Sequence, residues 1–117
     1  MDDQDRIEEW LGRYRTAWKT DDPAIIASLF TDDIRYHSTP YRDPRKGREE
    51  VVDWWTKHGD SKVAWTFDHE VLAQEGDLFV IRGLTHYPEK TYHNIWLVTL
   101  APDGRASEFI EYWMEER

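Results

Sequence analysis

Residues 92–113 read YHNIWLVTLAPDGRASEFIEYW, two runs of alternating side chains joined by Pro-Asp-Gly. Alternation with a period of two indicates β-strands, and a Pro-Asp-Gly sequence between them indicates a turn, so this stretch predicts a long β-hairpin. Its second strand contains FIEYW, in which Glu111 is the only charged residue among side chains that usually become buried. A carboxylate in that position needs either a structural partner or a function.

Two more strands of the same meander precede the hairpin. Apolar residues from Val63 to Val71 alternate with mainly polar ones, and QEGD then predicts a turn into a strand over residues 78–87. A second turn at PEK leads into residues 91–100, and the last strand is expected over residues 106–114. The second half of the chain is therefore predicted to be antiparallel β-structure.

The first half has mainly helical patterns. Apolar residues recur every three or four positions over residues 5–19, which predicts an amphipathic helix. Asp22 followed by Pro23 begins a second helix within residues 20–30, expected to bury Ile25, Ile26, Leu29 and Phe30. Residues 34–38 alternate as a strand, 38–47 predict a loop, and 47–59 predict a third helix.

This order predicts one α+β domain over residues 1–117, with three helices in the N-terminal half packed on a curved, mainly antiparallel sheet. The last strands carry apolar residues on both faces, whereas helices on one side cover only one of them. We therefore expect a homodimer in which Ile81, Ile95, Leu97, Ile110 and Tyr112 pack against a second copy. Ordinary β propensity on a solvated face is the alternative.

Composition excludes several classes of function. The 117 residues include 24 acidic and 15 basic ones, a formal net charge of −9, which argues against nucleic acid and against an anionic membrane surface as partners. The absence of cysteine excludes disulfides, thiolate metal sites and cysteine nucleophiles. The acidic start lacks signal-peptide features and no apolar run reaches membrane-spanning length, so a cytoplasmic location is expected.

The order of elements resembles the nuclear transport factor 2-like superfamily, and specifically its SnoaL-like branch. The matching stretches are YRTAWKTDDPAIIASLFTDDIRYHSTP, GREEVVDWW and the hairpin quoted above, so the resemblance covers residues 7–113. It implies a cone-shaped α+β barrel, commonly dimeric, whose open end holds a pocket for a small molecule. Members include ketosteroid isomerases, polyketide cyclases, dehydratases, epoxide hydrolases and proteins with no known reaction.

The resemblance assigns chemical groups only in part. Tyr14 matches the isomerase tyrosine that donates a hydrogen bond to the substrate oxygen. The isomerase base is an aspartate where this chain has Ser38, preceded by His37, and the protonated aspartic acid of those enzymes falls near Trp96. Two of the three groups are missing, so steroid isomerisation is not expected.

The isomerase pattern turns Tyr92, Asn94 and Trp96 toward the interior, and Glu111 then faces it too. Burial raises the pKa of a carboxyl group, which suits a general acid or base, whereas bonds from Arg82, Tyr14 or an indole would make Glu111 structural. The candidate catalytic residues are Glu111, Tyr14, Asn94 and His37. The expected pocket lining is Trp18, Tyr36, Ser38, Trp55, Arg82, Tyr92, Trp96, Phe109 and Trp113.

Two functions follow. The first is a small-molecule-binding protein with an aromatic pocket, which as an enzyme would perform cofactor-free isomerisation, cyclisation or dehydration on an apolar or planar oxygenated substrate. The second is a non-catalytic dimeric binding or interaction module whose interior its own aromatic residues fill. No residue spacing typical of a metal site or a phosphate loop is present, so neither a metal nor a cofactor is expected.

Overall fold

The second and third helices begin where the sequence indicates, and the first begins two residues earlier than predicted, at Asp3. In the computed structural model, which describes residues 2–117, the helices are α1 (Asp3–Thr20), α2 (Pro23–Ala27) and α3 (Arg48–His58). The Asp22 carboxylate accepts a hydrogen bond from the Ala24 amide at 2.9 Å, and Pro23 occupies the first turn, as predicted. The second helix is shorter than expected, because the chain turns at Ser28 and Phe30 already belongs to a strand.

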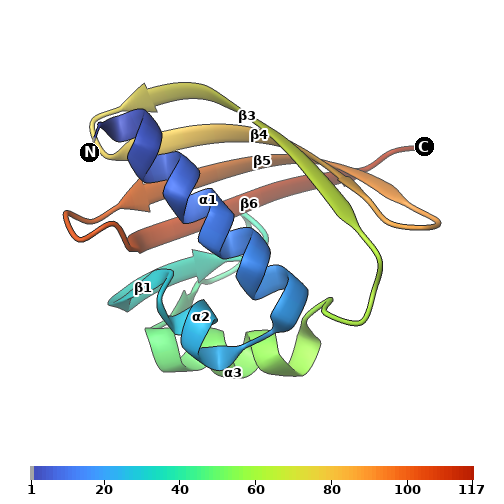
Figure 1. The fold of residues 1–117 in the computed structure, drawn as a ribbon, viewed down its shortest axis with the longest axis horizontal. Coiled ribbons are helices and arrows are strands. Elements are labelled where there is room, and N and C mark those ends of the chain that lie inside the picture. The colour runs from blue at the N-terminus through green and yellow to red at the C-terminus, as the bar shows by residue number, and fades with distance from the viewer. Residues whose placement is uncertain (1) are drawn as a thin grey trace.

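Six strands form one curved sheet (Figure 1). They are β1 (Phe30–His37), β2 (Arg45–Lys46), β3 (Thr66–Glu75), β4 (Leu78–His86), β5 (Thr91–Leu100) and β6 (Ala106–Glu115). The order across the sheet is β2-β1-β6-β5-β4-β3, and only the pairing of β1 with β6 is parallel. Strands β2 and β3 form the two edges, so the sheet is curved but does not close. The predicted α+β class is confirmed.

The helices all lie on one side of the sheet. In Figure 1, α1 runs along the face formed by β3 to β6, while α2 and α3 lie beside β1. The apolar stripe of α1 (Ile7, Trp10, Leu11, Tyr14, Ala17 and Trp18) is buried against this face. Full burial of one such large side chain contributes about 1.5–3 kcal/mol, so this stripe provides much of the stabilisation of α1.

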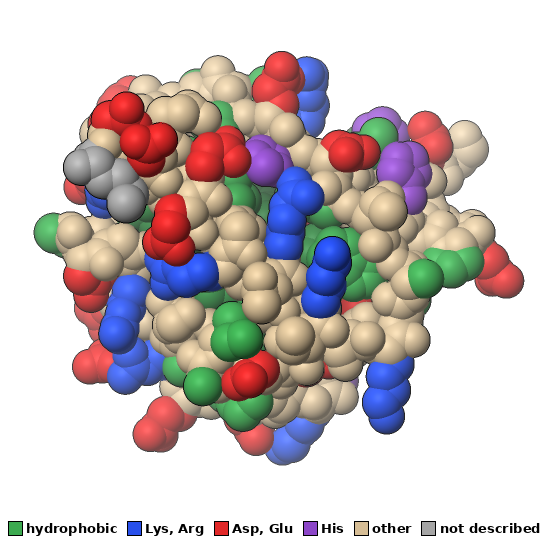
Figure 2. Space-filling model, in the orientation of Figure 1, with side chains coloured by type: hydrophobic (Ala, Val, Ile, Leu, Met, Phe, Trp, Pro, Cys, Tyr) green, Lys and Arg blue, Asp and Glu red, His purple; other side chains and the backbone are tan. Residues whose placement is uncertain are grey.

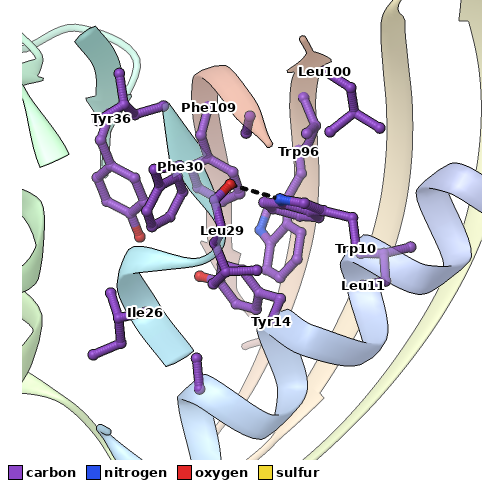
Figure 3. Packing of buried hydrophobic residues seen from close by; sticks show 14 of the residues in the cluster. Trp10, Leu11, Tyr14, Ile26, Leu29, Phe30, Tyr36, Trp96, Leu100 and Phe109 are labelled. Carbon is purple, nitrogen blue, oxygen red and sulfur yellow. Dashed lines mark hydrogen bonds between the residues drawn. The ribbon is translucent and has the colours of Figure 1, made fainter. Parts of the chain in front are cut away.

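The core is largely aromatic. Figure 3 shows Trp10, Tyr14, Phe30, Tyr36, Trp96 and Phe109 packed together between α1 and the sheet. The indole Nε1 of Trp10 donates a 3.0 Å hydrogen bond to the Leu29 carbonyl, so the segment between α2 and β1 is tied to α1. The Tyr36 and Phe109 rings stack with centroids 4.8 Å apart. These aromatic rings fill the space between α1 and the sheet.

The structure corrects the prediction for one face of β4. Ile81, which was assigned to the outer face, is fully buried and lies beside inward-facing Trp96 in the register of the two strands. Arg82 is consequently on the outer face, where it pairs with Glu70. Both faces of β4 carry apolar residues, so alternation alone does not decide which face points toward the core.

The surface carries charges of both signs. Figure 2 shows acidic and basic side chains interspersed over the face that carries the helices. No helix of the described residues is long and apolar enough to cross a membrane.

Candidate functional site

A cavity of about 440 Å³ lies at one end of the aromatic core. Strands β4, β5 and β6 form one wall, and the cavity also contacts α1, β1, α3 and the loop after α3. Its lining consists of Tyr14, Trp18, Tyr36, Trp54, Trp55, His58, Gly59, Asp60, Val63, Thr85, Tyr87, Lys90, Tyr92, Asn94, Trp96, Glu111 and Trp113. Nine of these seventeen residues are Trp or Tyr, so the wall is largely aromatic, and six others carry polar or charged side chains: His58, Asp60, Thr85, Lys90, Asn94 and Glu111.

Glu111 is held at the wall through one of its two carboxylate oxygens. Oε2 accepts a 2.9 Å hydrogen bond from the Asn94 amide nitrogen and a 3.0 Å hydrogen bond from the Trp96 indole nitrogen. No described residue donates to Oε1. One oxygen is therefore fixed by the protein and the other is available to whatever occupies the cavity.

The orientation of Asn94 is fixed in turn. The buried Thr85 hydroxyl donates a 2.8 Å hydrogen bond to Asn94 Oδ1, which leaves the amide NH₂ directed toward Glu111. Thr85 and Asn94 lie on adjacent strands, where Asn94 pairs with Gly83, two residues before Thr85, so they are diagonal neighbours on one face and the sheet itself sets this geometry. The chain Thr85–Asn94–Glu111 satisfies the buried polar groups and keeps the carboxyl group in one position.

Burial raises the pKa of the Glu111 carboxyl group from 4.5 to about 7. Loss of hydration is the main cause, because it disfavours the ionised form. The hydrogen bonds from Trp96 and Asn94 oppose this rise, and the negative charge of Asp60 adds to it. Glu111 therefore exists as a mixture of protonated and ionised forms near neutral pH.

Three tyrosine hydroxyls near Glu111 stay protonated. Burial raises the pKa of both Tyr14 and Tyr36 well above the usual value, and the negative charge of Glu111 adds to each rise. The pKa of Tyr87 is raised by burial and by its 2.7 Å hydrogen bond to Asp60. These hydroxyls are neutral donors rather than bases.

Asp60 is a second carboxylate in the cavity wall. Its Oδ2 accepts hydrogen bonds from the Tyr87 hydroxyl and from the Trp18 indole nitrogen, the latter at 3.2 Å. Oδ1 has no side-chain donor among the described residues. Asp60 thus repeats the arrangement seen at Glu111, with one oxygen bound by two donors and one oxygen open.

The loop that carries Asp60 is anchored by Asp21. The Asp21 carboxylate accepts hydrogen bonds from the Trp55 indole at 3.1 Å and from the Ser61 amide at 3.2 Å. A Cβ atom at Gly59 would stand 2.1 Å from Asp21 Oδ1, so the close approach of this loop requires glycine. Asp21 itself has a positive φ of 51°, a conformation that Asp tolerates better than most residues.

The structure brings together most of the candidate residues. Glu111, Tyr14 and Asn94 line the cavity, and of the expected lining residues Trp18, Tyr36, Trp55, Tyr92, Trp96 and Trp113 do so as well. Trp113 is 51% exposed and contacts Tyr92 edge-on at 5.7 Å. The inward face of the β5–β6 hairpin is the face that the sequence analysis assigned to the interior.

Four candidates lie outside the lining. His37 bonds through its ring to the Arg42 carbonyl at 3.2 Å, and Ser38 accepts a bond from Arg45. Arg82 is on the outer face because β4 has the opposite orientation to the one expected. Phe109 faces inward but is fully buried beneath Tyr36, in the filled part of the core.

Sequence reasoning missed Asp60, Thr85 and Tyr87. Asp60 follows a helix end, where no periodicity reports orientation, whereas Tyr87 ends the strand predicted over residues 78–87 and lies on the face of it that was assigned outward. Thr85 is inward-facing on β4 and was missed with the rest of that face. Among residues 2–117, no group of three or more His, Asp or Glu side chains is arranged to hold a metal ion.

Solved structures with the same fold are distantly related in sequence. An NTF-2-like protein of unknown function from Burkholderia xenovorans has 19% identity and a TM-score of 0.75, over 97% of this chain and 87% of that one. SalBIII, an epoxide hydrolase/cyclase-like enzyme of pyran ring formation in salinomycin, has 17% identity and a TM-score of 0.76, over 97% and 95%. A steroid delta-isomerase from Pseudomonas aeruginosa has 17% identity and a TM-score of 0.69, over 93% and 80%.

These likenesses show the fold and not an activity. No curated protein matches the chain in sequence. The family model for the SnoaL-like domain matches residues 11–112, which include almost the whole sheet and all the cavity-lining residues except Trp113. This chain therefore belongs to the SnoaL-like domain family.

Proposed function

We propose that this protein binds a small apolar or planar molecule in the cavity and that Glu111 exchanges a proton with it. The observation that carries the proposal is the position of Glu111, with Oε2 held by Asn94 and Trp96 and Oε1 open to the cavity. Because nine of the lining residues are aromatic, a flat ligand would find stacking partners on several sides.

The chemistry suited to this arrangement is proton transfer without a cofactor. A carboxyl group with a pKa of about 7 has both forms populated near neutral pH, so Glu111 can remove a proton from a bound molecule or supply one. Tyr14 is neutral and lines the same cavity beside Tyr36, with which its hydroxyl interacts, so this pair of hydroxyls can supply a donor to a ligand oxygen. Isomerisation, cyclisation and dehydration are reactions of this kind.

The test combines a titration with a ligand screen. The Glu111 carboxyl carbon is followed by NMR against pH, with Glu111→Gln to assign the signal, and planar ketones and polyketide-like compounds are screened for turnover. A pKa near 7 and a turnover lost in Glu111→Gln would support the proposal. A pKa at or below the ordinary value of 4.5, with no binding in the cavity, would make Glu111 a structural residue and refute the proposal.

A non-catalytic binding module is the second candidate. It is favoured by the two hydrogen bonds on Oε2, because donors of this kind also stabilise a purely structural carboxylate. The first candidate predicts a turnover that Glu111→Gln abolishes, whereas the second predicts ligand binding with no turnover to abolish. Ligand binding without any turnover in the wild type would assign the protein to the second.

We also propose that the outer face of the sheet forms a homodimer contact. Support comes from Tyr112, which is 45% exposed, and from Ile95, Leu97 and Ile110, which remain partly exposed on that face. Exposed apolar surface of this kind is typical of the interface in a symmetric homodimer. Light scattering after size-exclusion chromatography would give twice the chain mass for the wild type and the single-chain mass for Ile95→Glu. A single-chain mass for the wild type would refute the contact.

A further inference from the structure

The charge inside the cavity is one-sided. The lining contains two carboxyl groups, Glu111 and Asp60, and each has one oxygen that no described residue binds. The donors on the other oxygens are two indoles, an amide and a hydroxyl, all of them uncharged. Neutral donors orient a carboxylate but leave its charge uncompensated.

The basic residues of the lining do not supply the missing charge. Lys90 is 58% exposed in its side chain, and its ammonium group binds Glu115 at 3.3 Å on the hairpin end. His58 is exposed and contacts the Trp54 ring, with ring centroids 6.2 Å apart. Arg45 lies outside the lining, where its guanidinium binds Ser38 and lies 4.1 Å from the Trp54 centroid. Glu111 and Asp60 have no cationic side chain within hydrogen-bonding distance among the described residues.

The rest of the wall suits a cation as well. The face of an aromatic ring carries partial negative charge and attracts cations, most strongly in the case of Trp. Trp18, Trp54, Trp55, Trp96 and Trp113 all line the cavity, together with four tyrosines. A positively charged group is thus the one kind of ligand atom that both the aromatic and the carboxylate parts of this wall attract.

We propose that the ligand is a small organic cation, a molecule with a protonated or quaternary nitrogen on an apolar or aromatic body, whose nitrogen faces the open oxygens of Glu111 and Asp60. This inference rests on the proposed function, since it names the ligand class of the same cavity. The net charge of −9 also favours the approach of a cation from solution.

A cationic ligand makes binding depend on pH. The titratable side chains that line the cavity with Glu111 are His58 on α3, Asp60 after α3, Tyr14 from α1, Tyr36 from β1, and Tyr87, Lys90 and Tyr92 from the β4–β5 hairpin. Tyr14, Tyr36 and Tyr87 stay neutral, so the gain of negative charge near neutral pH comes from Glu111, and the Glu111→Gln variant separates it from any contribution of His58. The cation should bind more tightly as Glu111 loses its proton, and its binding should release a proton from Glu111.

The experiment compares three probes of similar size with the purified protein. Benzyltrimethylammonium is the cation, neopentylbenzene is its uncharged carbon counterpart, and benzenesulfonate is an anion. Binding is measured by calorimetry and by NMR shifts of the Trp18 and Trp96 indole protons, which report on the cavity. The expected result is that the cation binds about tenfold or more tightly than the uncharged probe, with the anion weakest.

Variants assign the effect to the cavity. Glu111→Gln and Asp60→Asn should each weaken cation binding about tenfold, while binding of the uncharged probe changes little. Asp53→Asn removes the same charge from an exposed position on α3 that binds Lys57, and it should leave cation binding unchanged. Between about pH 5.5 and about pH 8 the cation should gain affinity in the wild type and lose this dependence in Glu111→Gln.

The outcomes separate this inference from the function on which it rests. Equal or tighter binding of the uncharged probe or the anion would overturn the cationic ligand and leave an apolar binding cavity in place. Equal weakening by Asp53→Asn would also overturn it, because the cation would then respond to overall charge. If none of the three probes shifts the indole protons, both the cationic ligand and the proposed binding of a small molecule in the cavity are refuted.

Discussion

Glu111→Gln should remove a loss of stability that the wild type undergoes as pH rises through neutrality. In the folded protein burial raises the pKa of Glu111 to about 7, whereas in the unfolded chain it takes its ordinary value near 4.5. Between these values the folded state binds more protons than the unfolded state, so the free energy of unfolding falls as pH rises. Below about pH 4.5 the Glu111 side chain contributes no such change, because it is protonated in both states.

The size of the effect follows from the two pKa values. A pKa change of one corresponds to about 1.4 kcal/mol, so a rise from 4.5 to about 7 corresponds to about 3 kcal/mol of stability lost by about pH 8. This figure is an upper value, because Glu111 keeps some surface toward the cavity and water there weakens the penalty. Glutamine stays neutral, so the variant avoids this loss.

Urea unfolding at about pH 5 and about pH 8 measures the effect. The variant should gain about 2–3 kcal/mol relative to the wild type between the two pH values. Glu108→Gln is the matched control. Glu108 lies on the same strand but outside the cavity lining, and its carboxylate forms a 3.0 Å ion pair with Arg35. It should follow the wild type at both pH values. A difference between Glu111→Gln and wild type that does not change with pH would refute the buried, unpaired state of Oε1.

Four further variants test the pKa of Glu111 and the stability of the fold around it. Asp60→Asn should lower the pKa of Glu111, measured by NMR, because it removes a negative charge that raises it. Arg82→Gln should leave that pKa unchanged and cost no more than about 1 kcal/mol in thermal unfolding, since Arg82 is in an exposed pair with Glu70. Gly83→Ala should destabilise by about 1–3 kcal/mol, because its Cβ would stand 2.4 Å from the Phe67 ring, whereas Gly12→Ala, which meets nothing within 4 Å, should stabilise α1 by about 0.5–1 kcal/mol.

The sequence predicted the elements well where one periodicity dominates. The stripe from Ile7 to Trp18 defines α1, and Asp22 with Pro23 defines the start of α2. Alternation in β5 and β6 placed Asn94 and Glu111 on one face, and the register of those strands confirms it. Burial of one face is the physical cause of the patterns in α1, β5 and β6, and capping of the helix N-terminus is the cause at Asp22.

Alternation does not decide the orientation of β4. Leu78, Val80 and Leu84 on one face are as apolar as Phe79 and Ile81 on the other, and Gly83 carries no side chain to report a direction. The core side is set by Phe67 of β3, whose ring packs over Gly83 and stacks on Trp96 at 4.8 Å. This is a contact between three strands, which no local pattern contains. For this reason the sequence analysis assigned Ile81 to the outer face and Arg82 to the inner face, the reverse of the arrangement in the structure.

The strand pair β5–β6 makes both the core and the cavity, and its polar residues mark the boundary. Toward the turn that joins these strands, Val98, Leu100 and Phe109 are buried, and Tyr36 and Trp10 cover Phe109. Toward the other end, α3 and its following loop stand opposite the sheet, and space remains in front of Asn94 and Glu111. Glu111 is therefore the first inward-facing residue of β6 beyond the filled core. A carboxyl group at that boundary loses much of its hydration and still reaches the cavity, and both properties are needed for proton exchange with a ligand.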